Sequence, residues 1–318
     1  MEPIGARLRP GLAVFALDGN RIQIGLADPV ILDGLTADEA SFIASLEGPR
    51  TPTARRASDF SRVLGDLAVR GLLLVPDSGA HVEVRTAARA VRVAVVGASP
   101  LGVAVGLCLA QSGVDHVLFD DPTTVPVDQA SRAGAYATWA QAAAHTVNHW
   151  STAVGRATSE PAAQAGANVT VVVASGAVDT ALIHDLMAAD QPHLPVLTDE
   201  LGITVGPLVV PGRGPCLTCL GIERASREPH WPRVALQCNG SRAAYAPAPL
   251  GAVAAGVASH IVSRFVEAGE YTPTQWRIVT AEFGPHVVQQ SVTRHPACAC
   301  CGPLVLGDKL QNLQAVLL

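Results

Sequence analysis

Two Cys-x-x-Cys pairs constrain the fold of this chain more than any other feature. Cys216 pairs with Cys219, and Cys298 pairs with Cys301. Thiolates three positions apart on a tight turn can bind one tetrahedral ion, and two such pairs complete the four-ligand shell of zinc. Four cysteine ligands leave no coordination position for water or substrate, so such a metal ion stabilises the fold and does not catalyse. The sequence therefore predicts a structural zinc site that joins two distant segments.

Composition predicts a soluble, two-domain protein. The chain has 318 residues, 49% of them hydrophobic and 15% charged, which is enough to bury a large core. It begins without the apolar stretch of a signal peptide, no apolar run has the roughly 20 residues that span a bilayer, and the odd number of cysteines fits a reducing compartment. We therefore expect a cytoplasmic protein.

The charged residues narrow the classes of function. The formal net charge is -5 and no block of basic residues is present, which argues against a general nucleic-acid surface. Because no apolar run is long enough to span a bilayer, we expect no membrane partner either. Lys309 is the only lysine, and the other basic residues are arginines. A mechanism that needs a lysine in the middle of the chain is therefore excluded.

Residues 1–85 are predicted to form a winged-helix-like module. Two short strands flank the turn residues 18–20, and a capping box of Thr36 and Glu39 starts a helix. A second amphipathic helix carries the apolar stripe Phe60, Val63, Leu64 and Leu67. Such modules bind DNA or peptides. Because acidic residues accompany the arginines of the second helix, no basic recognition face is predicted and the DNA alternative is disfavoured.

Residues 90–318 are predicted to form an α/β, Rossmann-like domain. Apolar strands at 91–98, 116–121 and 168–176 are separated by helical or loop segments, which is typical of a parallel sheet covered on both faces. A long helix of small residues follows at 249–269, and 277–295 resembles a closing hairpin. The segment 122–166 carries no pattern that assigns it to a helix or a strand.

A glycine-bounded turn joins the first strand of this domain to its helix. In Gly97-Ala98-Ser99-Pro100-Leu101-Gly102 the glycines allow close backbone approach, and the N-terminus of the helix offers free N–H groups to a phosphate. Ser99 replaces the usual middle glycine, and Pro100 removes one donor. Asp120 and Asp121 end the second strand, where an acidic residue can hold a ribose hydroxyl. The turn is either a nucleotide site or a scaffold that no longer binds one.

Over about residues 90–305 the chain resembles the ThiF/MoeB-type family, relatives of the ubiquitin-activating enzymes. The resemblance lies in the order of four features: the VVGAxxLG turn, the acidic strand end, GPCLTCL and the late Cys-x-x-Cys pair. Members adenylate the C-terminal carboxylate of a small protein with ATP and magnesium, and hold a structural zinc ion with two such pairs. The resemblance assigns Cys216, Cys219, Cys298 and Cys301 to zinc. It assigns Gly97 and Gly102 to the phosphate turn, and Asp120 or Asp121 to the ribose.

The catalytic residues of the family are displaced or absent in this chain. The family's Asn-Leu-x-Arg segment is replaced by DDPTTVPVDQASRAG, in which Arg132 is the nearby candidate. The phosphate-binding lysine has no counterpart, and ASGAVDT leaves only Asp179 of the magnesium-binding carboxylates. Cys238 lies where some relatives take up the activated carboxylate on a thiol, or it is an inert cysteine. The resemblance implies ATP and magnesium as cofactors. Because phosphoryl chemistry depends on cations held around the phosphates, the missing and displaced residues disfavour adenylation.

A narrower resemblance covers the zinc region. PGRGPCLTCLGIERASREPHWPRVALQ and RHPACACCG are similar to the ThiF-like partner proteins of azoline-forming YcaO cyclodehydratases, the TOMM precursor leader-peptide-binding proteins. These join a peptide-binding module, a RiPP recognition element, to a ThiF-like domain that no longer adenylates. The resemblance implies that a precursor peptide adds as a β-strand to the first module. The predicted peptide-binding residues, which are alternatively ordinary core, are Arg21, Ile22, Ile24, Phe60, Val63, Leu64 and Leu67.

Two principal hypotheses follow. The first is a catalytically degenerate ThiF-like protein that binds a leader peptide and presents it to a separate enzyme such as a YcaO cyclodehydratase. The alternative is an ATP-dependent adenylyltransferase that activates the C-terminal carboxylate of a peptide or small protein, with Arg132, Asp121 and Asp179 essential. The resemblance also implies a homodimer, and the small-residue helix from Leu250 to Phe265 suits close packing of two subunits.

Overall fold

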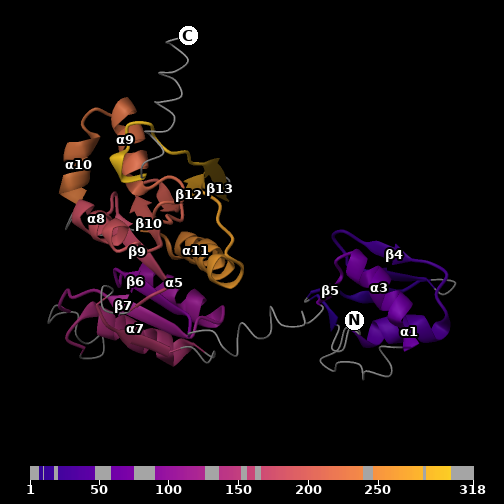
Figure 1. Cartoon of the computed structure of the whole chain (residues 1–318). Helices are drawn as coiled ribbons and strands as arrows, with labels where there is room; N and C mark the ends of the chain where they lie inside the picture. Colours follow the sequence, from indigo (N-terminus) through magenta and orange to yellow (C-terminus); the bar gives the residue numbers. More distant parts are fainter. Residues whose placement is uncertain are drawn as a thin grey trace, which may run out of the picture. The chain divides into compact units, whose positions relative to one another are not determined.

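The computed structural model describes residues 7–9, 11–17, 21–46, 59–74, 90–125, 136–151, 156–161, 166–238, 246–281 and 284–301. The chain divides into two compact units, Met1–Arg89 and Ala90–Leu318, which are coloured indigo to violet and purple to yellow in Figure 1. Each unit has its own buried core.

Unit 1 is a small α+β fold. Strands β2 (Val14–Ala16), β3 (Ile22–Ile24) and β4 (Val30–Leu32) form an antiparallel sheet in the order β2-β3-β4. Strands β1 (Arg7–Leu8) and β5 (Leu73–Leu74) pair separately. Helices α1 (Ala37–Ser45) and α3 (Ser61–Val69) share one core with the strands. The two predicted helices are present, the turn at 18–20 lies outside the described residues, and β4 is an unpredicted third strand.

The local sequence explains where the helices of unit 1 begin and how they meet. The Thr36 hydroxyl accepts a hydrogen bond from the Glu39 amide at 3.2 Å, and the Thr36 amide donates to the Glu39 carboxylate at 2.8 Å. This confirms the predicted capping box. Arg62 of α3 pairs with Glu39 at 2.5 Å, and the rings of Phe42 and Phe60 stack with centroids 4.4 Å apart. An ion pair and an aromatic contact thus join the two helices in addition to their shared core.

Unit 2 is built on an eight-stranded sheet in the order β13-β12-β11-β10-β9-β6-β7-β8. Five neighbouring strands are parallel, and the other three add to them antiparallel. The parallel strands are β6 (Arg92–Val96), β7 (His116–Asp120), β8 (Arg156–Ser159), β9 (Val169–Ser175) and β10 (His193–Asp199). The antiparallel strands are β11 (Gly202–Val205), β12 (Thr274–Ala281) and β13 (Gly284–Ser291). The predicted parallel sheet and closing hairpin are confirmed.

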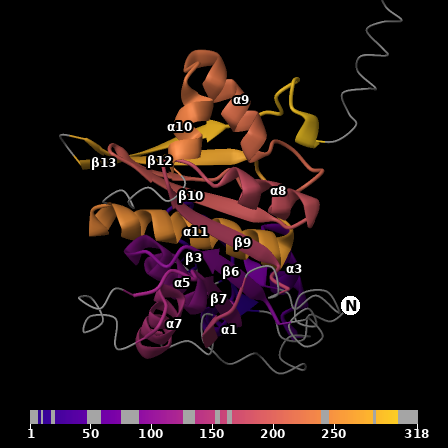
Figure 2. The same cartoon turned by 90° about the vertical axis from the view of Figure 1, so that its left-hand side faces the viewer.

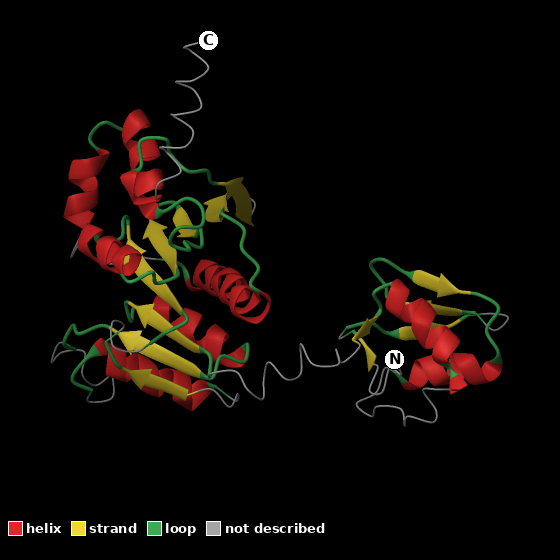
Figure 3. Cartoon of the chain, in the orientation of Figure 1, coloured by secondary structure: helices red, strands yellow, loops and turns green. Residues whose placement is uncertain are grey.

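Helices cover both faces of this sheet, as the secondary-structure colouring of Figure 3 shows. On one face α5 (Pro100–Gln111), α7 (Trp139–Trp150) and α11 (Ala248–Ala268) share the main core with the strands. On the other face α8 (Thr180–Ala188) and the start of α9 (Leu217–Arg227) pack against Val172 and Val96. Helix α10 (Trp231–Cys238) follows α9, and both lie at the end of the unit in Figure 2.

Helix α11 is long and apolar enough, by length and composition, to cross a membrane. Its small residues Gly251, Ala254, Ala255 and Ala258 are buried instead against the main core of unit 2. The helix has therefore the setting of a core helix in a folded domain.

The strand order reverses direction between β6 and β9. From β6 the chain proceeds to β7 and β8 on one side, and then returns to β9 and β10 on the other. Open parallel sheets bind ligands in the crevice outside the carboxyl ends of the two strands where this reversal occurs. A small-molecule site is therefore expected beside the residues that follow β6, β7 and β9.

Candidate functional site

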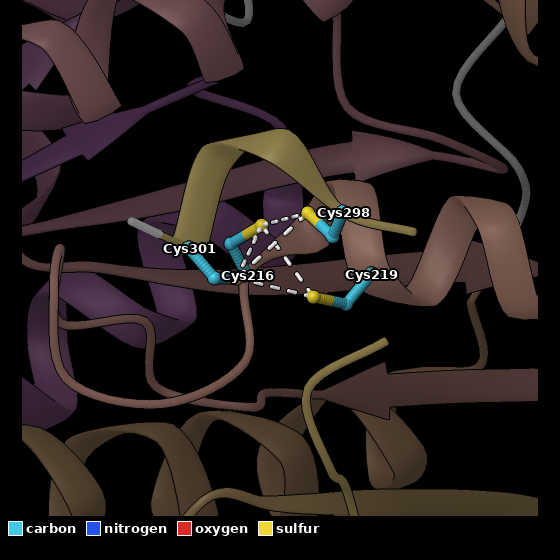
Figure 4. Close-up of side chains that lie close together, drawn as sticks. All are labelled: Cys216, Cys219, Cys298 and Cys301. Carbon is cyan, nitrogen blue, oxygen red and sulfur yellow. Dashed lines mark hydrogen bonds between the residues drawn. The ribbon is translucent and has the colours of Figure 1, made fainter. Parts of the chain in front are cut away.

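The four predicted zinc ligands converge on one point. Cys216 and Cys219 come from the start of α9, Cys298 precedes the short 3-10 turn η3 (Ala299–Cys301) and Cys301 ends it. The four sulfur atoms face one another in Figure 4. Neighbouring Sγ atoms lie 3.2–3.9 Å apart. Four thiolates about 2.3 Å from one tetrahedral ion would be spaced by about 3.8 Å. The donor set and its dimensions fit a closed tetrathiolate metal site.

The surroundings of the thiols favour a bound cation. All four side chains are buried. Burial, the largest cause, and the neighbouring thiols raise the pKa of Cys298 to about 12, and the same causes raise the pKa of Cys301. At Cys219 burial acts in the same direction, but hydrogen bonds from the backbone and from the neighbouring thiols lower its pKa overall. A divalent metal ion stabilises the thiolate form of every ligand and so lowers the pKa of the thiols whose pKa burial has raised. The buried set of four sulfur atoms is therefore well suited to metal binding.

The glycine-bounded turn lies at the reversal point of the sheet. Gly97 has φ +95°, and a Cβ there would lie 2.5 Å from the carbonyl oxygen of Val173 in β9. A Cβ at Gly102 would overlap the carbonyl oxygen of Gly97. Both glycines are therefore required by close backbone packing, and together they place the N-terminus of α5 at the carboxyl end of β6.

Most N–H groups of this turn are already bonded. The Gly97 amide donates to the Asp120 carbonyl at 3.0 Å, and the Ala98 amide donates to the Asp121 carboxylate at 2.9 Å. The Ser99 hydroxyl caps α5 by accepting from the Gly102 amide at 3.3 Å. The amides of Ser99 and Leu101 have no acceptor among the described residues. Two backbone donors thus remain for an anion.

The predicted acidic residues have different settings. Asp121 accepts hydrogen bonds through both carboxylate oxygens, from the amides of Ala98 and Thr123. These two bonds fix the turn to the end of β7. Asp179 is the N-cap of α8 and accepts from the Ala181 amide at 2.9 Å. Arg132 lies outside the described residues.

The structure brings Cys238 to the same edge of the sheet. Its sulfur would lie 2.7 Å from a Cβ on Gly176, the residue that follows β9, so the end of α10 rests on the carboxyl end of β9. The sequence places Cys238 only in a region between the zinc pairs, and gives no signal for its contact with Gly176. Gly97 and Asp179 follow strands, Asp120 ends one and Cys238 rests on one, so all four lie at the carboxyl edge of the sheet.

The predicted peptide-binding surface of unit 1 requires a correction. β3 pairs with β2 on one side and with β4 on the other, so it has no free edge for an added strand. Ile22, Ile24, Val63, Leu64 and Leu67 are buried core residues, and Phe60 packs against that core. Arg21 is exposed and lies 3.8 Å from Asp33. Among the strands that the structure describes, the outer edges of this sheet belong to β2 and β4.

Other residues from the zinc region have structural partners. The guanidinium of Arg224 stacks on the Trp231 ring at 3.5 Å and pairs with Glu228, so this aromatic residue joins α9 to α10. His295 accepts from the Ala297 amide through Nδ1 at 3.1 Å, and Cys300 is exposed with its sulfur 3.5 Å from the Thr218 hydroxyl.

Comparison with known proteins identifies the fold. No family model and no curated protein matches the chain. Among solved structures, E. coli MccB has a TM-score of 0.64 at 16% identity, and the match covers 95% of this chain and 98% of MccB. The microcin C7 biosynthetic enzyme MccB in complex with N-formylated MccA gives 0.62 at 16% identity, over 94% and 100% of the two chains.

Two further structures extend this result. MccB has also been solved with ATP, at a TM-score of 0.63, 16% identity and coverage of 94% and 100%. PaaA gives a TM-score of 0.58 at 15% identity, over 90% of this chain and 100% of PaaA. The matches span both units. The resemblance to ThiF/MoeB-type proteins is therefore confirmed at the level of the fold.

Proposed function

We propose that this chain binds a precursor peptide and activates its C-terminal carboxylate with ATP. The observation that carries the proposal is the extent of the match to MccB, which covers 95% of this chain and includes both units. MccB is named as a biosynthetic enzyme and has been solved with ATP and with N-formylated MccA. The alternative reached from the sequence, an adenylyltransferase, is thus better supported than a purely non-catalytic role.

The proposed reaction is an acyl adenylation. A carboxylate oxygen of the peptide bonds to the α-phosphorus of ATP, the bond from that phosphorus to the pyrophosphate oxygen breaks, and pyrophosphate leaves. The N-terminus of α5 and the amides of Ser99 and Leu101 would stabilise the phosphates, and Asp120 would hold the ribose. Asp179 would supply one carboxylate ligand to magnesium, which commonly takes only one or two from protein.

A second candidate is a partner protein that presents the peptide to another enzyme, such as a YcaO cyclodehydratase, without activating it. Specific observations favour it: both oxygens of Asp121 are bonded within the fold, Asp179 caps a helix, and the only lysine is Lys309. Adenylation needs cations around the developing charge. The two candidates therefore share peptide binding and differ in whether ATP is used.

Pyrophosphate exchange separates the candidates. The full chain is incubated with labelled pyrophosphate, ATP, magnesium and a synthetic precursor peptide, and incorporation of label into ATP is measured. Activation predicts exchange that depends on the peptide and falls at least tenfold in Asp120→Ala. Asp115→Ala, a change of the same kind before β7, is the control. Peptide binding without exchange would support the presenting role and contradict activation.

For unit 1 we propose that the peptide adds as a strand to an open edge of the sheet. Main-chain hydrogen bonds to an exposed edge are a general mode of peptide recognition, and β2 and β4 are the edges that remain. Hydrogen exchange of the full chain with and without peptide tests this. Protection gained in Val14–Ala16 or Val30–Leu32 is expected, and unchanged exchange in both strands despite binding would contradict it.

For the cysteine cluster we propose zinc, bound by Cys216, Cys219, Cys298 and Cys301. Sulfur ligands in tetrahedral arrangement are typical of structural zinc, and a reducing cytoplasm would keep the thiols available. We also propose a homodimer, for which Val253 and Gly256 on the exposed side of α11 offer a small-residue surface. Elemental analysis of purified protein and light scattering coupled to size exclusion test the two proposals.

A further inference from the structure

The loop that leads into the first zinc pair is held from the segment that leads into the second. Arg294, four residues before Cys298, donates from Nε to the Gly214 carbonyl at 3.0 Å and from Nη2 to the Gly212 carbonyl at 2.8 Å. Gly212 and Gly214 precede Cys216. One guanidinium thus joins two segments that are 80 and 82 positions apart in the sequence.

The conformation of the loop allows this double contact. Gly212 has φ +75° and Gly214 has φ +113°, a region that favours glycine. A Cβ at Gly214 would overlap the Tyr271 hydroxyl, so the ring of Tyr271 lies directly against the loop. The two glycines therefore turn the loop so that both carbonyls face the planar fork of Arg294, which suits bidentate contact better than a lysine ammonium.

Arg213 lies in the same loop but has a different role. Its guanidinium stacks over the Tyr271 ring, with the carbon Cζ 5.0 Å from the centroid. Its side chain donates no hydrogen bond to any other residue in the described part of the chain. Arg213 thus carries the same charge close to the cluster without joining the two segments.

We propose that Arg294 is a positioning residue for the metal site, which keeps the two Cys-x-x-Cys pairs converged and slows the loss of the metal. The inference rests on the proposed zinc site and is independent of the proposed adenylation. A tetrathiolate site can open only if its two pairs separate, and the hydrogen bonds of Arg294 oppose that separation. Outer contacts of this kind typically change metal affinity by roughly 10–100-fold.

The test measures zinc release from the full chain. Purified wild type, Arg294→Gln, Arg294→Lys and Arg213→Gln are analysed for zinc content and then mixed with excess chelator and a colorimetric zinc indicator. We expect release to be on the order of 10–100-fold faster in Arg294→Gln than in Arg213→Gln, with Arg294→Lys between them. The tryptophan fluorescence of each sample is followed in parallel, and release is expected to precede any unfolding.

Three results would contradict the inference. If the rate of zinc release from Arg294→Gln lay within about twofold of the rate from Arg213→Gln, then charge near the site, and not the hydrogen bonds of Arg294, would set the rate. If zinc were released at the same rate as the native fluorescence is lost, Arg294 would contribute only to the general stability of the fold and not to the metal site in particular. Wild-type protein without zinc would overturn the zinc proposal itself, a result that elemental analysis separates from the other two. If Arg294→Gln does not fold, Arg294→Lys against wild type gives the same comparison.

Discussion

Replacing Gly102 by alanine tests how the glycine-bounded turn is built. In an open helix position this change is stabilising by about 0.5–1 kcal/mol, because glycine loses more backbone entropy on folding. At Gly102 the new Cβ would overlap the carbonyl oxygen of Gly97 and lie 3.1 Å from its carbonyl carbon. Neither group can rotate away because both are backbone. Overpacking of this kind costs about 1–3 kcal/mol.

The balance of these effects is a net loss of up to about 2.5 kcal/mol, which for a unit of this size lowers the melting temperature by up to roughly 10 °C. Since Gly97 and Gly102 place the N-terminus of α5, the same change should weaken ATP binding. Differential scanning calorimetry and ATP titration of the full chain measure the two effects.

Gly221→Ala is the matched control. Gly221 lies inside α9, and a Cβ there would meet nothing within 4 Å. This change should leave stability unchanged or raise it by up to about 1 kcal/mol. If Gly102→Ala were as stable as Gly221→Ala, the inferred overlap with Gly97 and the structural reason for the second glycine would both be refuted.

Three other predictions concern separate parts of the molecule. His193 is buried, which lowers its pKa from the ordinary value of 6.5, while its bond to the Gln191 carbonyl acts in the opposite direction. The unfolded chain therefore binds the proton of His193 more readily than the folded chain does. The contribution of His193 to stability is fully present above about pH 6.5 and falls with acidification. Urea unfolding between pH 7.5 and 5 should show this fall in the free energy of unfolding, and His193→Leu should make its pH dependence flatter. Thr36→Ala removes the cap of α1 and should speed hydrogen exchange of the first-turn amides roughly 2–30-fold, whereas Ser45→Ala at the other end should leave them unchanged. Cys298→Ser should weaken zinc binding by more than 100-fold, beyond the roughly 10–100-fold of outer-contact changes, while Cys300→Ser should retain the metal; equal metal content in both variants would contradict the ligand assignment.

The elements that the sequence predicted well are those with a strong pattern. The apolar strands that became β6, β7 and β9, and the two cysteine pairs, depend on residue type and spacing alone. The segment 122–166 was not assignable because the buried face of α7 consists mainly of alanines, Ala140 and Ala142–Ala144 with Val147. Alanine gives little contrast between a buried and an exposed helix face, so the period of 3.6 residues is hard to detect there.

The error in unit 1 has a different cause. β3 lies in the middle of the sheet because β4 pairs with it. β4 has only three residues, and the alternation of an exposed Ile31 with a buried Leu32 is too short to establish a period in the sequence. Without β4, the first hairpin has a free edge on both strands. The hydrogen bonds of Arg294 could not be predicted from the sequence either, because its partners are two backbone carbonyls far away in the chain. Residue patterns carry no information about such acceptors, although the Gly-Arg-Gly run before Cys216 indicates an unusual loop.

The turn at the end of β6 bears directly on whether ATP is used. Residues 97–102 have five N–H groups, since Pro100 has none, and three of them are bonded within the fold. A phosphate at this turn would therefore have the amides of Ser99 and Leu101 and the dipole of α5, which is a weaker anion site than a turn with all its donors free. Breaking the bond from Ala98 to Asp121 would release one more donor, but it would leave a carboxylate beside the phosphates. If the chain binds ATP as proposed, productive binding would thus depend on cations that offset the charge of Asp120 and Asp121. ATP itself can bring magnesium as such a cation. Measuring how strongly the affinity for ATP depends on magnesium therefore tests whether this turn supports activation of the peptide or only its presentation.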